Sequence, residues 1–395
     1  LQTACARNHF GMKRRTESGI VKPLRVLHLG KYFPPFSGGI ENFMADLMTA
    51  STELGIAVAA IVHDHGAQVD VEPGFPVWRV PTHGELIHAP LSPSFRRHLL
   101  RALESWQPDL LHVHMPNTSA FWLLTLAELN TPYVVHWHAD VLTPGARQAL
   151  RIAYRAYRPL EGALLRRAAA VIATSPSYLD SSAALAPWRA KCEVIPLGLS
   201  SRRIGELHET PPSATAWPTP GALRVLAVGR LSRYKGFDHL IRAVAELRGV
   251  ELVILGEGEQ GQALRELIVH RHAADRIAMP GRVADPTRNR LLRQCDLLCL
   301  PSINRNEAFG LVLLEAMALG KPALVTRVPG SGMSWVVDAG HTGWHVEPED
   351  PVGLERQLAE IRDHRDTLAP MGRQAQRHFE ERFEIAAVAA RTVAL

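Results

Sequence analysis

The sequence has no long hydrophobic run, few cysteines and no Asp-x-Asp motif. Its longest apolar stretches have the length of a strand, as at residues 168–173, whereas a membrane-spanning helix needs about 20 apolar residues. Four cysteines among 395 residues exclude a disulfide framework and are typical of a reducing compartment. The first residues lack the apolar core of a secretory signal. We therefore expect a cytoplasmic protein that starts at Met12, with residues 1–11 outside the fold.

A strong excess of one charge is also missing. The chain has 44 Lys and Arg residues against 39 Asp and Glu, a net charge of +5, with 46% hydrophobic residues. This ordinary mixture excludes a disordered or collagen-like chain and does not indicate nucleic acid as a partner. At roughly 100 to 200 residues per domain, the length predicts two or three domains.

Apolar, strand-like segments alternate with helical segments along both halves of the chain. Continuous apolar runs indicate strands buried on both faces, and their alternation with helices predicts doubly wound parallel sheets. In the first half we expect strands at residues 24–29, 56–62, 77–81, 109–114, 133–138, 169–174 and 192–196. In the second half we expect them at residues 223–229, 251–256, 276–279, 296–300 and 322–326.

A segment rich in proline, serine and threonine separates the two halves. We interpret residues 201–222 as a linker without regular structure, because they contain four prolines. The predicted domains are residues 12–200 and 223–370, and a final helix at 371–395 is expected to pack back on the N-terminal domain. Ligands of open α/β sheets bind beyond the carboxyl ends of the strands, so functional residues are expected there.

Two strands of the first half end in a His-x-His pattern. His112 and His114 form one pair, and His136 and His138 form the next. Because side chains alternate along a strand, each pair shares one face. Four such histidines could bind a metal ion, but buried imidazoles are more often hydrogen-bonded core residues. A single histidine that points between the domains is the favoured functional element, and His138 is best placed for it.

Two loops after strands carry residue types that suit a phosphate group. Ser37, Gly38 and Gly39 precede a helix whose free N–H groups can bind an anion, although an ordinary turn would look similar. In the second half, Arg230 and Lys235 follow a strand. A planar guanidinium and a mobile ammonium suit a diphosphate, although solvated loop cations would have the same pattern.

A glycine-rich motif follows the second strand of the second half. Gly256, Gly258 and Gly261 spell the G-x-G-x-x-G of dinucleotide-binding folds. The motif belongs after the first strand of such a fold, and the next strand should end in an acid that binds the ribose. Here that strand ends in Pro280 and Gly281. A dehydrogenase is therefore disfavoured.

The most informative segment is residues 306–322. Glu307 and Glu315 bracket seven residues, and the helix that starts at 309–311 presents free N–H groups and the positive end of its dipole. Glu315 lies about one turn into this helix, where it can accept hydrogen bonds from sugar hydroxyls. It could also be a surface residue, but its neighbours are apolar, and a buried carboxylate needs a partner.

Together these segments resemble the retaining glycosyltransferases of the GT-B fold, in the large family four. The resemblance covers most of the chain and rests on EAFGLVLLE, GRLSRYKG, SGGIE and IPLGL. The segment HWHAD at 136–140 is similar to a subgroup that builds bacterial surface polysaccharides, often as mannosyltransferases. The resemblance implies two Rossmann-like, doubly wound parallel-sheet domains that face a central cleft.

The resemblance also implies a role for each candidate residue. Arg230 and Lys235 match the diphosphate-binding pair, and Glu315 matches the carboxylate that binds the ribose. Glu307 and His138 match a carboxylate and a histidine near the transferred sugar, so we expect these two and the cationic pair to be catalytic. The other matches are Gly38 and Gly39 over the phosphates, Phe309, Gly310 and Leu311 along phosphate and sugar, and Arg282 and Val283 beside the base.

The implied reaction needs neither a metal ion nor a cofactor. Donors already in place stabilise the leaving nucleoside diphosphate, and Asp-x-Asp, typical of metal-dependent enzymes of the other main fold, is missing. Retention of configuration is implied by the family, in which a leaving phosphate oxygen assists deprotonation of the acceptor. The expected donor is GDP-mannose or a UDP-sugar.

The N-terminal domain is expected to bind a glycan or polyprenyl-linked acceptor. Arginines recur at 147, 151, 155, 158, 166 and 167 with one acid, Glu161, and a second basic group lies at 96, 97 and 101. Basic amphipathic helices bind anionic lipid, so we expect peripheral contact with the inner face of the cell membrane, with a solvated helix face as the alternative. A sugar-nucleotide epimerase and a non-catalytic scaffold remain alternative functions.

Overall fold

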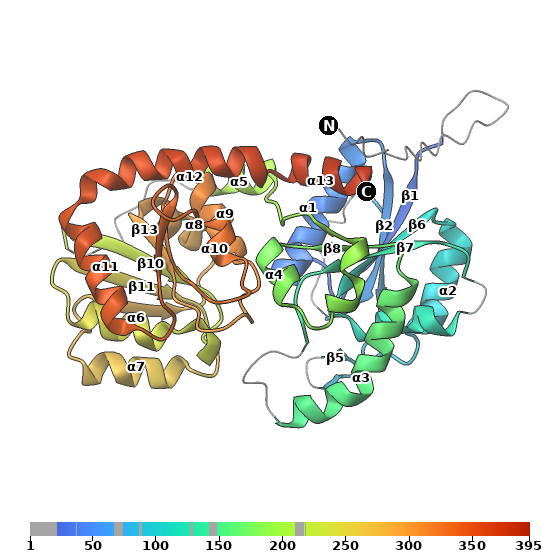
Figure 1. Cartoon of the computed structure of the whole chain (residues 1–395), viewed down its shortest axis with the longest axis horizontal. Helices are drawn as coiled ribbons and strands as arrows, with labels where there is room; N and C mark the ends of the chain where they lie inside the picture. The colour runs from blue at the N-terminus through green and yellow to red at the C-terminus, as the bar shows by residue number, and fades with distance from the viewer. Residues whose placement is uncertain are drawn as a thin grey trace, which may run out of the picture.

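Two parallel sheets form two α/β domains that lie side by side (Figure 1). The computed structural model describes residues 22–36, 38–66, 74–86, 89–126, 129–141, 148–209, 217 and 219–395. The predicted class of two doubly wound domains is confirmed. Ser37 of the predicted phosphate loop and Arg147 of the basic group lie outside the described residues.

The N-terminal domain is built on a seven-stranded sheet in the order β3-β2-β1-β6-β7-β8-β9. Its strands are β1 (Arg25–Leu29), β2 (Ala57–His63), β3 (Val77–Val80), β6 (Leu110–Met115), β7 (Tyr133–Trp137), β8 (Ala170–Ala173) and β9 (Cys192–Val194), and a separate hairpin joins β4 (Glu85–Leu86) to β5 (Ala89–Pro90). Its helices are α1 (Gly39–Glu53), α2 (Phe95–Trp106), η1 (Thr118–Thr125), α3 (Gln148–Arg167), α4 (Pro176–Ser181) and η2 (Ala186–Lys191).

The C-terminal domain is built on a six-stranded sheet in the order β12-β11-β10-β13-β14-β15. Its strands are β10 (Leu223–Val228), β11 (Val250–Leu255), β12 (Ile277–Gly281), β13 (Leu297–Leu300), β14 (Ala323–Thr326) and β15 (Gly343–Val346). Its helices are η3 (Arg233–Lys235), α6 (Phe237–Ala245), α7 (Gly261–His270), α8 (Asp285–Gln294), α9 (Leu311–Ala318), α10 (Met333–Val336), α11 (Pro351–Asp363) and η4 (Arg365–Thr367). Strands β4, β5 and β15 were not expected from the sequence, because β4 and β5 have only two residues each and Gly343 and His345 interrupt the apolar pattern of β15.

The two faces of the N-terminal sheet differ in chemistry. Leu27 and Leu29 of β1 lie in an apolar core with residues of β6 and β7. His28, between them, points to the opposite face, where Phe43 of α1 contacts the histidine rings at the end of β7. Strand β7 ends at Trp137, so His138 lies one residue beyond the strand rather than at its last position, while its N–H still donates to the carbonyl of Met115.

Part of the predicted linker is a helix, which corrects the expectation of an irregular segment. Helix α5 (Ser201–His208) begins after Ser200, whose side chain caps it by accepting a hydrogen bond from the N–H of Arg203. Leu207 is buried, and Asn289 of α8 donates to the carbonyl of Glu206. The prolines that indicated an irregular segment lie after this helix, so the capping serine and the tertiary contacts decide the structure of the first part.

The C-terminal residues cross from one domain to the other. Where one helix was predicted at 371–395, the structure has two, α12 (Leu368–Arg382) and α13 (Ile385–Ala394). Helix α12 packs against α9, and α13 packs against α1 of the N-terminal domain (Figure 1). Leu199 bonds through its backbone to Phe383 and Ile385, so the break between the helices forms part of the junction. In the described ranges, every helix is too short or too polar to cross a membrane.

Candidate active site

Lys235 and Glu307 form a buried ion pair at the carboxyl edge of the C-terminal sheet. Lys235 ends the short turn η3 after β10, Glu307 follows β13, and Nζ of Lys235 donates to Oε2 of Glu307. Burial alone would lower the pKa of Lys235, but the negative charge and the hydrogen bond of Glu307 outweigh it and raise that pKa. Lys235 is therefore a fixed cation. Arg230, the other member of the predicted pair, is exposed on the same loop.

The N-termini of two helices lie opposite each other between the domains. Gly310 (φ 83°) turns the chain into α9 in a left-handed conformation, and no side chain caps that helix. Gly39 is the first residue of α1, and a Cβ atom there would lie 3.2 Å from Cδ1 of Leu311, the first residue of α9. The uncapped N-terminus of α9 favours an anion at this point, whereas the carboxylate of Glu41 already lies against the start of α1. An added side chain at position 39 would narrow the space between the two helices.

Glu41 lies against the start of α1 and was not singled out from the sequence. Its carboxylate lies so close to Gly38 that it would have to move to make room for a side chain at position 38. Burial raises the pKa of Glu41, and the charge of Lys31 acts in the opposite direction. The motif SGGIE therefore contains both a helix N-terminus and an acidic side chain that folds back over it.

Glu315 is buried in α9 and is held by two arginines. Arg203 of α5 donates to Oε1 of Glu315 at 2.8 Å, and Arg288 of α8 donates to Oε2. The sequence indicated that a buried carboxylate needs a partner, but it did not reveal which one, because Arg203 is 112 residues away. A carboxylate has about four lone-pair positions, so these two bonds leave Glu315 able to accept hydrogen bonds from a ligand.

A further buried ion pair joins the two domains. Nη2 of Arg305 lies 2.9 Å from Oδ2 of Asp140, and the two side chains are 11% and 7% exposed. The guanidinium of Arg305 also lies 4.5 Å from the ring centre of Tyr178 and donates to the carbonyl of Ser181. Oδ1 of Asp140 accepts hydrogen bonds from Trp137 at 2.8 Å and from Ser182 at 2.7 Å. Arg305 lies two residues before Glu307, so this contact ties the Glu307 loop to the N-terminal domain.

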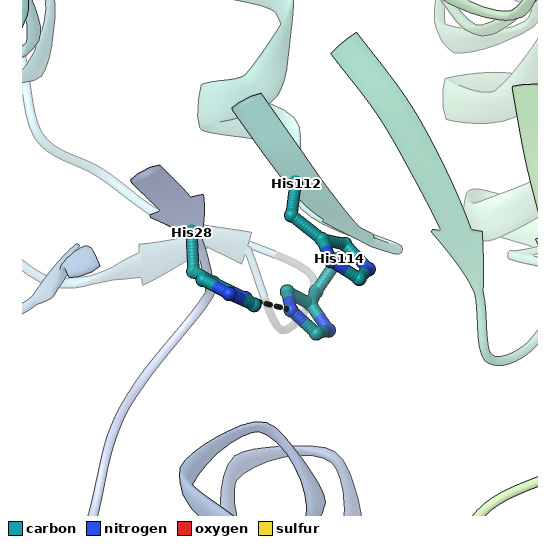
Figure 2. Close-up of side chains that lie close together, drawn as sticks. All are labelled: His28, His112 and His114. Carbon is teal, nitrogen blue, oxygen red and sulfur yellow. Dashed lines mark hydrogen bonds between the residues drawn. The ribbon is translucent and has the colours of Figure 1, made fainter. Parts of the chain in front are cut away.

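His138 belongs to a cluster of five buried histidines rather than standing alone. The cluster consists of His28, His112, His114, His136 and His138, and Figure 2 shows how His28 reaches His114 while His112 lies beside them. Burial lowers the pKa of His138 to about 3, and it lowers the pKa values of the other four as well. All five rings are therefore neutral near pH 7. His138 can donate or accept a hydrogen bond, but it carries no permanent positive charge. His28 was missed because its strand shows no His-x-His pattern.

The remaining predicted residues lie around the same edge with different exposure. Phe309 is buried, with its ring 6.1 Å from that of Phe383, so only its backbone is available to a ligand. Arg282 and Val283 directly follow β12, where Arg282 is exposed and Val283 is partly buried against the core that includes Phe309. Apart from Glu315, which lies within α9, the predicted donor-site residues that the structure describes thus follow strands or start helices at one edge of each sheet.

Two family models match the chain. The model described as "Glycosyl transferase 4-like domain" matches residues 38–198, and "Glycosyl transferases group 1" matches residues 218–378. The chain belongs to the GT-B glycosyltransferases of family four. This membership confirms the family that the sequence motifs indicated.

Curated relatives match most of the length of this glycosyltransferase, and solved structures share its fold. It is 28% identical to O-antigen chain mannosyltransferase C of Escherichia coli, with 91% of this chain and 94% of the relative covered. It is 29% identical to D-rhamnosyltransferase WbpZ of Pseudomonas aeruginosa, with 91% and 92% covered. Sucrose-phosphate synthase of Thermosynechococcus elongatus has a TM-score of 0.77 at 22% identity, covering 94% of this chain and 97% of that one. Anabaena HepE, solved with UDP and glucose, has a TM-score of 0.73 at 23% identity, covering 94% and 98%.

The G-x-G-x-x-G motif of this glycosyltransferase has a structural explanation. A side chain on Gly256 would collide with the carbonyl of Gly229, and one on Gly258 would lie 2.5 Å from the carbonyl oxygen of Leu231. The backbone of Leu231 also bonds to Glu257 and Gln260. The glycines thus let the loop after β11 pack against the loop that carries Arg230, which accounts for the motif without a dinucleotide.

Proposed function

We propose that the protein transfers a hexosyl group, with mannose favoured, from a nucleotide-diphosphate sugar to a glycan or polyprenyl-linked acceptor in cell-surface polysaccharide biosynthesis. The observation that carries the proposal is the opposition of the α1 and α9 N-termini beside the Lys235–Glu307 pair. The N–H groups at the start of α9 and the ammonium of Lys235 attract an anion such as a diphosphate, and the start of α1 adds its own N–H groups once the Glu41 side chain turns away from it. The name of the E. coli relative supports mannose and the polysaccharide context.

The proposed chemistry uses charges that are already in place. As the bond between sugar and diphosphate breaks, Lys235, Arg230 and the N–H groups at 310–312 stabilise the charge that develops on the leaving group. We propose that this stabilisation acts without a metal ion and that the configuration at the anomeric carbon is retained. The leaving phosphate oxygen takes the proton of the acceptor hydroxyl as the new glycosidic bond forms.

The two carboxylates have separate proposed roles. Glu315, oriented by Arg203 and Arg288, accepts hydrogen bonds from the ribose hydroxyls of the nucleotide. Glu307 is oriented by Lys235 and lies near the hydroxyls of the transferred sugar, together with His138. Arg282 and Val283 lie beside the base, and Gly38 and Gly39 let the start of α1 approach the phosphates.

The acceptor is proposed to reach the N-terminal domain from a cytoplasmic membrane surface. Helix α3 exposes Ile152 (57%) and Leu160 (44%) among the exposed arginines 151, 155 and 158. A helix that combines exposed apolar and cationic side chains binds anionic lipid headgroups. Flotation with vesicles that contain anionic lipid, at low and high salt, tests this contact, and no binding at low salt contradicts it.

A binding screen followed by a transfer assay tests the proposal. Thermal unfolding is measured with GDP, UDP and ADP, and the nucleotide of the true donor raises the Tm because ligand binding stabilises the folded state. Donors with that nucleotide are then supplied in excess EDTA with a lipid-linked glycan, and NMR of the product reports the anomeric configuration. A free epimerised sugar would favour the epimerase, and stabilisation by none of the nucleotides would favour the scaffold.

A further inference from the structure

The five buried histidines are arranged in two hydrogen-bonded rows. In the first row, Nδ1 of His28 lies 3.0 Å from Nε2 of His114, and Nδ1 of His114 lies 3.0 Å from Nε2 of His138. In the second row, Nε2 of His112 lies 3.2 Å from Nδ1 of His136. Parallel pairing of β1 with β6 and of β6 with β7 sets this arrangement, because residues of neighbouring strands share one face of the sheet.

The two rows lie face to face. The rings of His112 and His114 are 4.7 Å apart at an interplanar angle of 7°, and those of His136 and His138 are 4.3 Å apart at 3°. Within a row, the planes of neighbouring rings are close to parallel, with 25° between His28 and His114 and 10° between His114 and His138, and the hydrogen-bonded nitrogens join ring edge to ring edge. The ring nitrogens of one row therefore point at each other and not at the other row.

Neutral rings in such a row cannot choose their tautomers independently. Each neutral imidazole carries one N–H and one lone pair, and each N···N contact needs one of each. If Nδ1 of His28 carries its hydrogen, then Nδ1 of His114 and Nδ1 of His138 must carry theirs. If Nε2 of His138 carries its hydrogen, then all three rings are in the Nε2–H form. Any mixed arrangement puts two hydrogens or none into one contact.

We propose that His28, His114 and His138 form one tautomeric unit, in which His114 is a positioning residue that determines what Nδ1 of His138 offers to the donor sugar. The part concerning the sugar rests on the proposed function. Nδ1 of His138 is buried and has no hydrogen-bond partner among the described residues. A buried N–H without an acceptor is rarer and costlier than an unused lone pair. Nε2 of His28, at the opposite end of the row, is not a buried atom without a partner, so a hydrogen is better placed there than on Nδ1 of His138. The ligand-free row is therefore in the Nε2–H form, and Nδ1 of His138 is left to accept a hydrogen bond from a sugar hydroxyl.

A metal ion is the competing occupant of this cluster. The nitrogens of His28, His112 and His114, and those of His114, His136 and His138, lie within 4.8 Å of one another. In each row, however, every lone pair except the terminal one is already used in an N···N contact, and neither group of nitrogens includes a carboxylate among the described residues to compensate a buried dication. The geometry favours the hydrogen-bonded rows, and a bound metal ion would overturn the proposal.

The test reads the tautomers directly. The full chain is labelled with 15N in histidine, and NMR at pH 7.5 separates protonated from unprotonated ring nitrogens, with single-histidine variants used for assignment. The expected result is Nε2–H on His28, His114 and His138. Different tautomers within the row, a shared Nδ1–H form, or stoichiometric zinc, copper or nickel in the purified protein would each overturn the proposal.

A pair of variants distinguishes the effect of breaking the hydrogen-bonded row from the effect of losing a buried ring on packing. His114→Leu should release His28 and His138 from their common tautomer, so that the ring 15N shifts of both move. His112→Leu removes a ring of the same size from the same strand and face but from the other row, and should leave the tautomers of His28 and His138 unchanged. Equal changes in the two variants would contradict the proposal. If His114→Leu does not fold, the wild-type spectrum alone decides.

The tautomers that the NMR experiment detects do not depend on whether the proposed function is correct. If the row shows one tautomer and no nucleotide raises the Tm, the tautomeric unit stands and the transferase proposal falls. If GDP or UDP binds and transfer proceeds while the row holds mixed tautomers, the transferase proposal stands and this inference falls. When transfer is measurable, His114→Leu should lower kcat for transfer at least threefold with little change in the KM of the donor, whereas His112→Leu should not.

Discussion

The two domains share a strand order but differ in the chemistry of their carboxyl edges. In both sheets the first strand is central, with the second and third on one side and the later strands on the other. The C-terminal edge holds buried ion pairs, in which Lys235 meets Glu307 and Glu315 meets Arg203 and Arg288. The N-terminal edge holds neutral histidines. The same backbone therefore supports fixed charges in one domain and neutral hydrogen-bonding groups in the other.

This difference follows from which side chains surround each buried group. A buried ammonium keeps its charge only where a carboxylate lies beside it, as for Lys235. The buried imidazoles have no such partner among the groups that shift their pKa values, so burial keeps them neutral. The C-terminal edge can therefore present charged hydrogen-bond donors to a ligand, whereas the histidines of the N-terminal edge can present only neutral donors and acceptors.

The largest expected effect is loss of stability in acid through the histidine cluster. The folded pKa values of these histidines lie well below the unfolded value of about 6.5, so the unfolded chain binds more protons below that pH. The free energy of unfolding therefore has its full value above about pH 6.5. Below that pH it falls by up to about 1.4 kcal/mol per pH unit for each buried ring. Urea unfolding at pH 7.5, 6.5 and 5.5 should show a steeply falling midpoint.

A variant pair checks that the cluster causes this acid sensitivity. His112→Phe removes one buried imidazole and should reduce the pH dependence by about one proton. His341→Asn changes an exposed histidine, whose side chain is 70% exposed, and should leave the pH dependence unchanged. An unfolding midpoint that is the same at pH 7.5 and 5.5 would show that the two edges do not differ in the way described.

The next largest effect is expected from removing the fixed cation of the C-terminal edge. Lys235→Ala leaves Glu307 buried without its partner and removes a charge from the leaving group, so kcat/KM should fall about hundredfold. Lys235→Arg keeps the positive charge and should recover part of the activity. Arg233→Ala changes an exposed residue on the same turn and should have little effect. Wild-type transfer rates in Lys235→Ala would remove Lys235 from the site.

A smaller loss is expected from Glu315→Ala. It removes the proposed ribose contact and leaves Arg203 and Arg288 without their carboxylate, so kcat/KM should fall at least tenfold, mainly through the KM of the donor. Glu347→Ala, which breaks an exposed pair with Arg327, is the matched control and should be neutral. Isothermal titration with the nucleotide measures the same loss without turnover, and unchanged affinity would refute the ribose role.

The smallest effect is expected where the two edges meet. Asp140→Asn keeps an acceptor for Trp137 and Ser182 but removes the charge opposite Arg305, so kcat/KM should fall about threefold to tenfold as the Glu307 loop loses its interdomain contact. Asp180→Asn changes a carboxylate that is 74% exposed and lies 3.9 Å from Arg189, so it should be neutral. Equal activities for the two variants would show that the junction does not position the loop.

Much of the fold was predictable because its signals are local. The apolar runs that became β1, β6, β10 and β13 have the length and composition of buried strands, so each lies within about one or two residues of its predicted position. Helix α5 was missed because its stability depends on a capping serine and on contacts with α8, while proline-rich residues nearby dominated the pattern. The single predicted C-terminal helix is two helices, because Phe383 is buried at the junction of the domains.

By itself the sequence determined the alternation of strands and helices, the glycine turns and the residue types at the strand ends, since these depend on neighbours within a few positions. Only the tertiary structure decided that Arg203 and Arg288 hold Glu315, that Arg305 reaches Asp140, and that His28 completes a row with His114 and His138. These partners lie between 24 and 165 positions apart, and the order of strands and the contact between domains bring them together. Periodicity along a chain reports which face a residue occupies, but it carries no information about which distant residue occupies the facing position.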